Sequence, residues 1–389
     1  MATLDLLTKA NSQNRDIHCF TVDHQLREDA KLESQFVADF CASRHIKHQT
    51  LVWDEDKPST GIQNAARWAR YQLLSKACEK VGAIGLVTGH NLDDQIETIL
   101  MRKLRDKSGE GVGLSGMAAA ALFFNSMWVL RPFLGIRKQA LKDHLSNASL
   151  NWIEDPSNQN ETFERVRIRN QADLSINVSE IEDQGRARQT LSNFAANYIR
   201  QYCSTNDGLV FEMNVTDAER RTLEKVLEVL VHVIGGRDRS LGRTDIEKLY
   251  DFAISPDDKR ITMGRVVLDK SDDKIQLYRE NRGFREVRVR AGEEIRWDGR
   301  FLIKNQRQGD DVIVRSNGDK LGCPPEVKRA GDDEWKPAFE NDSVGVTAII
   351  NKYDQVLPEF DLALANSFAA VLGRAVYSTP YDDTKVLFQ

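Results

Sequence analysis

Apolar and polar positions follow two different periods in the first 110 residues, and the two periods alternate along the chain. Residues 17–22 and 46–53 are short runs with many apolar and β-branched side chains, which is typical of strands. Residues 29–43 and 61–81 place apolar side chains three and four positions apart, as an amphipathic helix does, and residues 3–10 are also helical in pattern. Because strands alternate with helices, the sequence predicts an α/β fold with a doubly wound parallel sheet.

The pattern changes beyond about residue 171. Helical periodicity dominates residues 184–203 and 217–233, and strand-like patterns follow at 261–290 and 299–315. The sequence therefore predicts a helical domain and then a small β-rich C-terminal region. We place the α/β domain at 1–175, the helical domain at 176–260 and the β-rich region at 261–389.

The segment 83–98 joins a short apolar strand to the start of a helix whose first two turns contain Asp93, Asp94 and Glu97. Ligands of an open α/β sheet bind at this place, outside the carboxyl end of a strand. Asp94 and Glu97 are three positions apart and share a helix face. Two acids there can hold a substrate ammonium group or a metal ion. The alternative is capping, because acids in the first turn complement the helix dipole.

Length and composition limit the class of protein. A chain of 389 residues is long enough for two or three domains, and 41% hydrophobic with 29% charged residues is typical of a globular protein. No run of 18 apolar residues exists, so we expect no membrane span, and the first residues lack the layout of a signal peptide. The five cysteines are scattered and never form a C-x-x-C pair. This argues against a disulfide framework or a zinc site and favours a reducing cytoplasm.

The net charge of −5 does not decide whether the partner is a nucleic acid, because local clustering of charge matters more. Basic clusters occur at residues 102–107, 137–138 and 165–169. Such a run is most often a solvated face. Contact with the phosphates of a nucleic acid is the alternative.

Six short segments in a fixed order resemble one known family. They are TVDHQLR at 21–27, IQNAARWARY at 62–71, GHNLDDQIET at 89–98, GLSGM at 113–117, RPFL at 131–134 and WIEDPSN at 152–158. In these segments the chain resembles the tRNA(Ile)-lysidine synthetase family of the N-type ATP-pyrophosphatase, or PP-loop, group. The resemblance is strong over residues 1–170 and concerns only the layout beyond them.

The resemblance implies a Rossmann-like PP-loop domain and a ligase that modifies tRNA. The family uses ATP to adenylate the C2 oxygen of cytidine-34 in the CAU anticodon of tRNA(Ile), and the amine of free L-lysine then displaces AMP. The product, lysidine, changes the codon specificity from AUG to AUA. The implied partners are ATP, Mg²⁺, free L-lysine and this tRNA. The family often forms dimers, which implies a homodimer here.

The resemblance also assigns roles to residues near the end of the third predicted strand. Asp94 and Glu97 match the positions that bind the substrate lysine, whose cationic amine suits an acidic site. His90, Arg70 and Asp94 match catalytic positions, and the Arg70 guanidinium could stabilise negative charge that develops on phosphate. Asp93 is the candidate ligand for Mg²⁺, which would neutralise the phosphates of ATP.

Further assignments concern ATP and tRNA. Asp23, His24 and Gly89 match ATP-binding positions of the family. After the EDPSN loop the family has the pattern R-N-x-x-R, whereas this chain has RVRIRN at 165–170. We therefore assign tRNA phosphate binding to the cluster as a group, which consists of Arg165, Arg167 and Arg169.

Structural roles remain open for several of these side chains. His24 and His90 could each cap a strand end and hydrogen-bond to the backbone. Arg67 and Arg70 lie on one predicted helix, and one of them could be a structural ion-pair partner. We favour Arg70 as the functional one.

One part of the family pattern has no counterpart in this sequence. The family cradles the pyrophosphate of ATP with an S-G-G-x-D-S loop, and the similarity here begins at Met1, just after the position of that loop. We therefore expect the first strand of the sheet to be absent, which would leave an unpaired edge. Two explanations compete, a start that is set too late and a real truncation, and we favour the former.

Three functions follow from these observations. The first is the lysidine-forming enzyme. The second is a related tRNA thiolase, against which the lack of paired cysteines counts. The third is a catalytically impaired tRNA-binding remnant that lacks the ATP loop.

Overall fold

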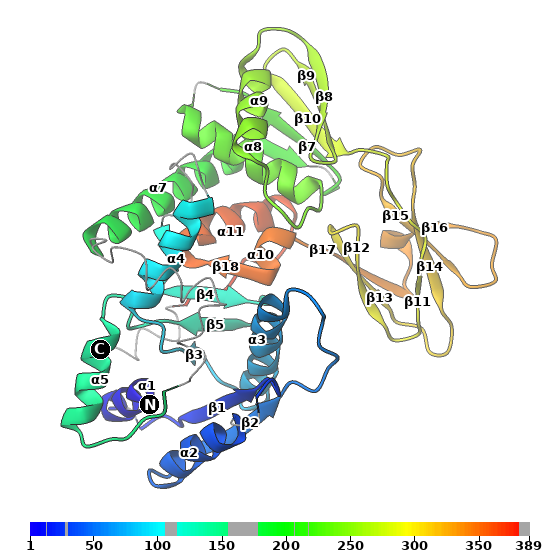
Figure 1. Cartoon of the computed structure of the whole chain (residues 1–389). Coiled ribbons are helices and arrows are strands. Elements are labelled where there is room, and N and C mark those ends of the chain that lie inside the picture. Colours follow the sequence, from blue (N-terminus) through cyan, green and yellow to red (C-terminus); the bar gives the residue numbers. More distant parts are fainter. Residues whose placement is uncertain are drawn as a thin grey trace. The chain divides into compact units, whose positions relative to one another are not determined.

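The computed structural model describes residues 1–12, 14–27, 30–105, 115–154, 178–205, 207–216 and 218–380. These residues form two compact units, the first built on Met1–Arg186 and the second on Ala187–Ser378 (Figure 1). Most of the predicted helical and β-rich regions fall together in the second unit. The boundaries drawn from the sequence at 175 and 260 stay predictions.

Unit 1 alternates helices with short strands, which confirms the α/β class predicted from periodicity. Its elements, in chain order, are α1 (Ala2–Ala10), β1 (His18–Asp23), α2 (Ala30–Ala42), β2 (Lys47–Val52), α3 (Ile62–Lys80), β3 (Leu86–Val87), α4 (Leu92–Arg105), β4 (Ala120–Phe123), β5 (Met127–Leu130) and α5 (Lys138–Asn147). The helix α7 (Val178–Tyr202) begins in unit 1 and continues into unit 2.

The strand expected at 83–87 is shorter in the structure, because the first of these residues belongs to the turn that ends α3. Gly82 adopts a left-handed conformation with a φ of 64°. The Ala83 N–H then returns to the Cys78 carbonyl at 2.9 Å. Only Leu86 and Val87 remain extended and paired, and they pair with β5.

The strands of unit 1 pair in two groups. β1 and β2 are parallel, in a register that runs from His18 opposite Lys47 to Asp23 opposite Val52. β5 lies between β3, to which it is parallel, and β4, to which it is antiparallel. Most of unit 1 therefore follows the parallel pairing that the βα alternation predicts, with β4 as an antiparallel addition.

A cleft of about 650 Å³ is lined by α1, by β1 and by the residues that lead into β3. Its lining is largely apolar and includes Leu4, Phe20, Ile84 and Leu86. Within the described ranges, β1 pairs with β2 alone and β3 with β5 alone. One backbone edge of each of these two strands is therefore left without a neighbouring strand.

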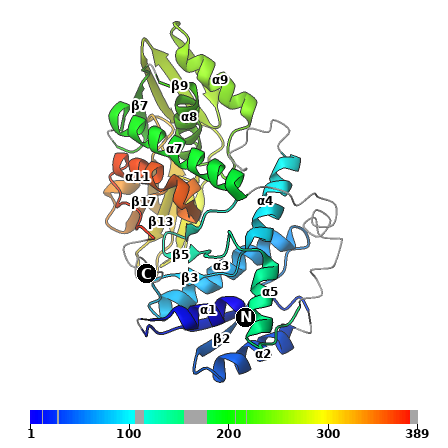
Figure 2. The same cartoon turned by 90° about the vertical axis from the view of Figure 1, so that its left-hand side faces the viewer.

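Apolar packing fixes the two helices that carry the site. α3 buries Ala66 and Ala69 against Trp53, which follows β2. α4 buries Leu92, Ile96 and Ile99 in a cluster that Ile181 of α7 completes. At the other end of the unit, α1 lies beside α5 (Figure 1 and Figure 2), where Oδ2 of Asp5 and Nε2 of His144 are 2.8 Å apart.

Unit 2 combines helices with three antiparallel sheets in the described residues. The strand orders are β6-β7-β10-β9-β8, β11-β14-β15-β16 and β12-β13-β17. Its helices are α8 (Arg220–Ile234), α9 (Arg243–Ile254), α10 (Asn351–Gln355) and α11 (Leu362–Val371), with 3₁₀ turns η3 (Ala338–Glu340) and η4 (Glu359–Asp361). Its strands are β6 (Cys203–Thr205), β7 (Val210–Asn214), β8 (Lys259–Met263), β9 (Val266–Ser271), β10 (Lys274–Arg279), β11 (Val287–Val289), β12 (Glu294–Trp297), β13 (Phe301–Asn305), β14 (Val312–Ser316), β15 (Pro325–Arg329), β16 (Lys336–Pro337), β17 (Val344–Ala348) and β18 (Val356–Pro358).

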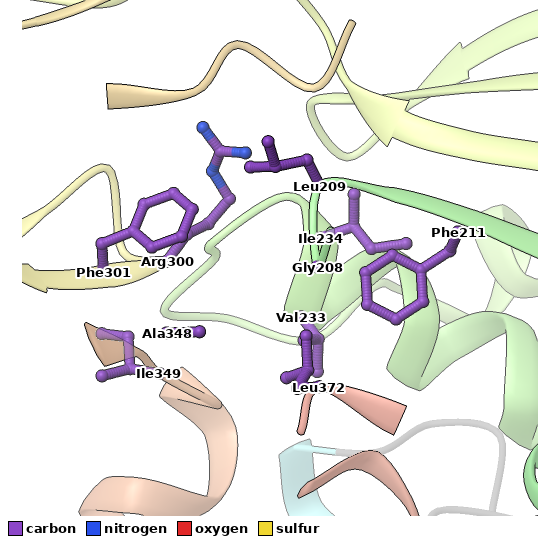
Figure 3. A pocket seen from close by; sticks show the side chains of 10 residues that line it. All are labelled: Gly208, Leu209, Phe211, Val233, Ile234, Arg300, Phe301, Ala348, Ile349 and Leu372. Carbon is purple, nitrogen blue, oxygen red and sulfur yellow. The ribbon is translucent and has the colours of Figure 1, made fainter. Parts of the chain in front are cut away.

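Unit 2 also contains a small cavity of about 20 Å³ (Figure 3). Phe211, Val233, Phe301 and Leu372 contribute to its apolar wall, and Arg300 is its charged side chain. A space of this size holds about one water molecule, so it is too small for a substrate. No helix in the described ranges is long and apolar enough to span a membrane.

Candidate active site

The carboxyl end of β3 leads directly into the polar segment singled out in the sequence. The Thr88 N–H continues the ladder by donating to the Leu130 carbonyl at 2.9 Å. Oγ1 of Thr88 and Nδ1 of His90 share a hydrogen bond of 2.8 Å. The sheet thus fixes Thr88, and Thr88 orients the imidazole of His90.

Gly89 allows α1 to approach this turn closely. A Cβ atom at position 89 would lie 2.7 Å from Oγ1 of Thr3. A side chain therefore cannot be added without moving Thr3. The predicted ATP-binding role of Gly89 stays a prediction, and its packing role is visible in the structure.

Asp94 takes part in the N-terminal cap of α4. Oδ1 of Asn91 accepts hydrogen bonds from the N–H groups of Asp93 at 3.0 Å and Asp94 at 3.4 Å. Oδ2 of Asp94 accepts the Asn91 N–H at 3.0 Å in return. This reciprocal pair is a capping box, with Asn91 as the cap and Asp94 three positions later. Asp94 therefore caps the helix, as the alternative predicted. Its other carboxylate oxygen, Oδ1, takes no part in the capping box.

Glu97 is one turn further along α4, on the helix face of Asp94. Glu97 is 3% exposed, whereas Asp94 is half-buried. Burial of a carboxylate is costly unless a cation or hydrogen-bond donors compensate it. One acid of this pair is therefore half-buried and the other buried, and the assignment of both to lysine binding stays a prediction.

Asp93 faces α5 and caps it. Its Oδ2 accepts the Lys138 N–H at 2.7 Å, and its Oδ1 lies 3.5 Å from Nη1 of Arg137. Both oxygens are engaged by α5, which does not fit a magnesium ligand. Among the described residues, no group of three or more His, Cys, Asp or Glu side chains could hold a metal ion. The need for Mg²⁺ stays a prediction.

A second cluster forms at the carboxyl end of β1. Nη2 and Nε of Arg70, from α3, lie 3.2 Å and 3.4 Å from Nε2 of His24. The Trp53 indole and the imidazole are nearly perpendicular, at 87°, with 5.9 Å between ring centres. Burial lowers the pKa of His24, and the positive charge of Arg70 lowers it further. His24 is therefore held as a neutral ring at neutral pH.

Asp23 anchors the turn after β1. It is 7% exposed, its Oδ1 accepts the Gln25 N–H at 2.8 Å, and its carbonyl accepts the Trp53 N–H at 2.9 Å. Gln25 adopts a left-handed φ of 54°. The carboxylate of Asp23 thus stabilises the bend that presents His24, and its predicted contact with ATP stays a prediction.

Sequence reasoning missed Gln95, which joins α4 to a distant loop. Its Nε2 donates to the Met117 carbonyl at 3.0 Å, and its Oε1 accepts the Met117 N–H at 2.6 Å. Nη1 of Arg102 donates to the neighbouring Gly116 carbonyl at 2.9 Å. The signal was present, since Gln95 is an uncharged polar residue next to the buried Ile96, but its partner lies 22 positions away.

The remaining candidates are arginines, and only some of them belong to the described residues. Arg165, Arg167 and Arg169 lie outside the described ranges, so their role in tRNA binding stays a prediction. The guanidinium of Arg67 stacks on the Tyr71 ring at 5.2 Å. Arg67 thus contacts an aromatic ring, whereas Arg70 contacts His24.

Comparison with known proteins adds an independent line of observation. Residues 1–173 match a family model described as a PP-loop domain. The chain is 35% identical over 386 residues to the tRNA(Ile)-lysidine synthase of Rhizobium meliloti. The matched region covers 92% of this chain and 85% of that protein. It is 34% identical over 399 residues to the enzyme of the same name from Brucella anthropi, covering 91% and 86% of the two chains.

One solved structure is more distantly similar. It is the U34-tRNA thiolase NcsA from Methanococcus maripaludis with its [4Fe-4S] cluster, at 14% identity and a TM-score of 0.33. The similarity covers 49% of this chain and 62% of that one. A likeness of this size carries no inference about function.

Proposed function

Because this chain belongs to the tRNA(Ile)-lysidine synthase family, we propose that it joins free L-lysine to C2 of cytidine-34 in the CAU anticodon of tRNA(Ile). The family and the PP-loop domain make it an ATP-dependent ligase that modifies tRNA. The observation that carries the finer proposal is the identity of 35% over 92% of the chain. The product, lysidine, would change the codon specificity of the tRNA from AUG to AUA.

The reaction has two balanced steps. The C2 oxygen of cytidine attacks the α-phosphate of ATP, a P–O bond forms, and pyrophosphate leaves. An amine of lysine then attacks C2, the C–O bond to AMP breaks, and the amine loses a proton. The first step is needed because the C2 oxygen is a poor leaving group until it is adenylated.

We assign the acids of α4 to the second substrate. The accessible Asp94 and the buried Glu97 lie on one helix face, and they would attract the positive charge of lysine. His90, whose ring hydrogen-bonds to Thr88, would contact the phosphate or the reacting base. Arg70 would stabilise charge on phosphate. Asp23, His24 and Gly89 would contact ATP.

We also propose the setting of the reaction. The cluster of Arg165, Arg167 and Arg169 would bind tRNA phosphates as a group. A reducing cytoplasm is the proposed location, which the scattered cysteines of the sequence favour. A homodimer and a requirement for Mg²⁺ with ATP complete the proposal.

Steady-state kinetics with a tRNA(Ile) transcript test the assignment of the acids. Glu97→Gln and Asp94→Asn should raise the KM for lysine at least about tenfold and change the KM for ATP by less than about twofold, since each removes about one favourable charge contact. Asp143→Asn, an exposed acid on α5, is the matched control and should change neither. Equal effects on both substrates would refute the lysine-site assignment.

The same experiment separates the alternative. Release of pyrophosphate that depends on the CAU-anticodon tRNA supports the ligase. Salt-sensitive tRNA binding without pyrophosphate release would support an impaired tRNA-binding protein instead.

A further inference from the structure

The imidazole of His24 is held on two sides at the edge of the sheet where ligands of α/β folds bind. The Arg70 guanidinium approaches Nε2 at 3.2 Å, and Trp53 forms a wall nearly perpendicular to the ring. Trp53 is 4% exposed, its backbone N–H donates to the Asp23 carbonyl and its indole N–H to Oε2 of Glu55, so the wall is fixed. The ring is therefore positioned by Trp53, which directly follows β2, and by Arg70 of α3.

The contact with Arg70 determines which ring nitrogen carries the proton. A guanidinium has only donors, so Nε2 of His24 must accept. A neutral imidazole that accepts at Nε2 carries its proton on Nδ1. Burial and the nearby positive charge both lower the pKa of His24, which favours this neutral ring.

The proton on Nδ1 has no acceptor within the described residues. Nδ1 of His24 is buried from solvent and makes no hydrogen bond there. Buried donors without a partner are rare in native proteins because they are costly. This donor lies beside an aromatic wall at the carboxyl end of the strands, where ligands of α/β folds bind. Such a place fits a flat aromatic ring with a nitrogen lone pair that can accept the proton.

We propose that Arg70 is a positioning residue that fixes His24 as the Nδ1–H tautomer, and that this N–H donates to an acceptor nitrogen of the adenine ring of ATP. The inference rests on the use of ATP in the proposed function and adds a role to Arg70. Arg70 acts here through His24, without contact with the base.

NMR of the full chain with ¹⁵N-labelled histidine tests the tautomer. The signals of His24 are assigned by their loss in His24→Asn. In the wild type we expect Nδ1 to be protonated and Nε2 to have the shift of an acceptor. Arg70→Met should release Nε2 and change this pattern. Arg67→Met, one turn away on the same helix, is the control and should leave it unchanged. A wild-type Nε2–H tautomer, or no change in Arg70→Met, would overturn the proposal.

Calorimetric titration with ATP and with 1-deaza-, 3-deaza- and 7-deaza-ATP tests the ligand. Asparagine places an amide N–H near the position of Nδ1, so His24→Asn should bind ATP within about threefold of the wild type. His24→Phe keeps the ring without the donor and should bind about tenfold more weakly. One deaza analogue should weaken binding to the wild type by a similar factor and cause no further loss in His24→Phe.

The outcomes are distinguishable from failure of the proposed function. ATP binding by His24→Phe equal to that of the wild type overturns this inference alone. Equal losses for every analogue in both proteins do the same. A wild type that binds no ATP overturns both this inference and the ATP assignment on which it rests. Native binding by His24→Asn shows that substitutions at this position leave the fold intact.

Discussion

At the scale of single residues, the start of α4 shows how structural and chemical roles share one short segment. Asn91 and Asp94 cap the helix by reciprocal hydrogen bonds, while Glu97 is buried on the same face. The sequence analysis placed these acids in the first two turns of a helix and left capping open as an alternative to ligand binding. The structure shows that Asp94 caps, and that capping uses only one of its oxygens.

Removal of the cap should destabilise the protein without removing a charge. Asn91→Ala should lower the free energy of unfolding by about 1 kcal/mol, because the first N–H groups of α4 lose their acceptor. Asn91→Ser keeps an acceptor and should cost less than half as much. Urea denaturation followed by circular dichroism measures both. Equal losses in the two variants would contradict the capping role.

The close approach at Gly89 gives a second residue-scale prediction. Gly89→Ala places a Cβ atom against Oγ1 of Thr3 and should destabilise by about 1 kcal/mol, at the low end for overpacking because a threonine side chain can rotate. The double variant with Thr3→Ala removes the obstructing atom and should recover most of the loss. Thermal unfolding of the four proteins in this cycle provides the test. Additive losses would show that the clash is not the cause.

At the scale of elements, the edges of β1 and β3 are the unusual feature of unit 1. Among the described residues, β1 pairs with β2 alone and β3 with β5 alone, and the apolar cleft of about 650 Å³ lies against both strands. The sequence led us to expect an unpaired edge. It could not show which strands carry that edge, because pairing depends on how segments far apart in the chain come together.

Hydrogen exchange should distinguish edge strands from inner ones. Alternate amides of β1 point away from β2, so they should exchange faster than the amides of β5, which has a neighbour on each side. Exchange measured by NMR at single amides checks this. Uniform protection along β1 would mean that its outer edge is covered in solution.

At the scale of the whole molecule, unit 2 contains a buried group of charges that ties its helices together. Glu228 of α8 lies 3.0 Å from Nζ of Lys225 and 3.1 Å from Nζ of Lys352 of α10. One turn along α8, burial and, second to it, the positive charge of Lys352 lower the pKa of His232 to about 4. The folded state therefore holds this histidine neutral.

This depressed pKa makes the stability of unit 2 depend on pH. The unfolded chain has a histidine pKa near 6.5, so it binds more protons than the folded state between about pH 6.5 and 4. Stability should fall as the pH decreases through this window, by up to about 3 kcal/mol. Urea denaturation at pH 7 and pH 4.5 measures the loss. His232→Gln does not titrate and should show a smaller loss, and an unchanged pH dependence would contradict the assignment.

The sequence by itself determined the order of helices and strands over the first 105 residues, the family and the position of the polar segment after β3. These follow from local periodicity and from contiguous motifs, which do not depend on distant parts of the chain. Only the tertiary structure decided the partners of each side chain. It placed Arg70 on His24, 46 positions away, Gln95 on Met117, and Asp93 at the start of α5. Such contacts arise from the packing of whole elements, and no local pattern of residues specifies them.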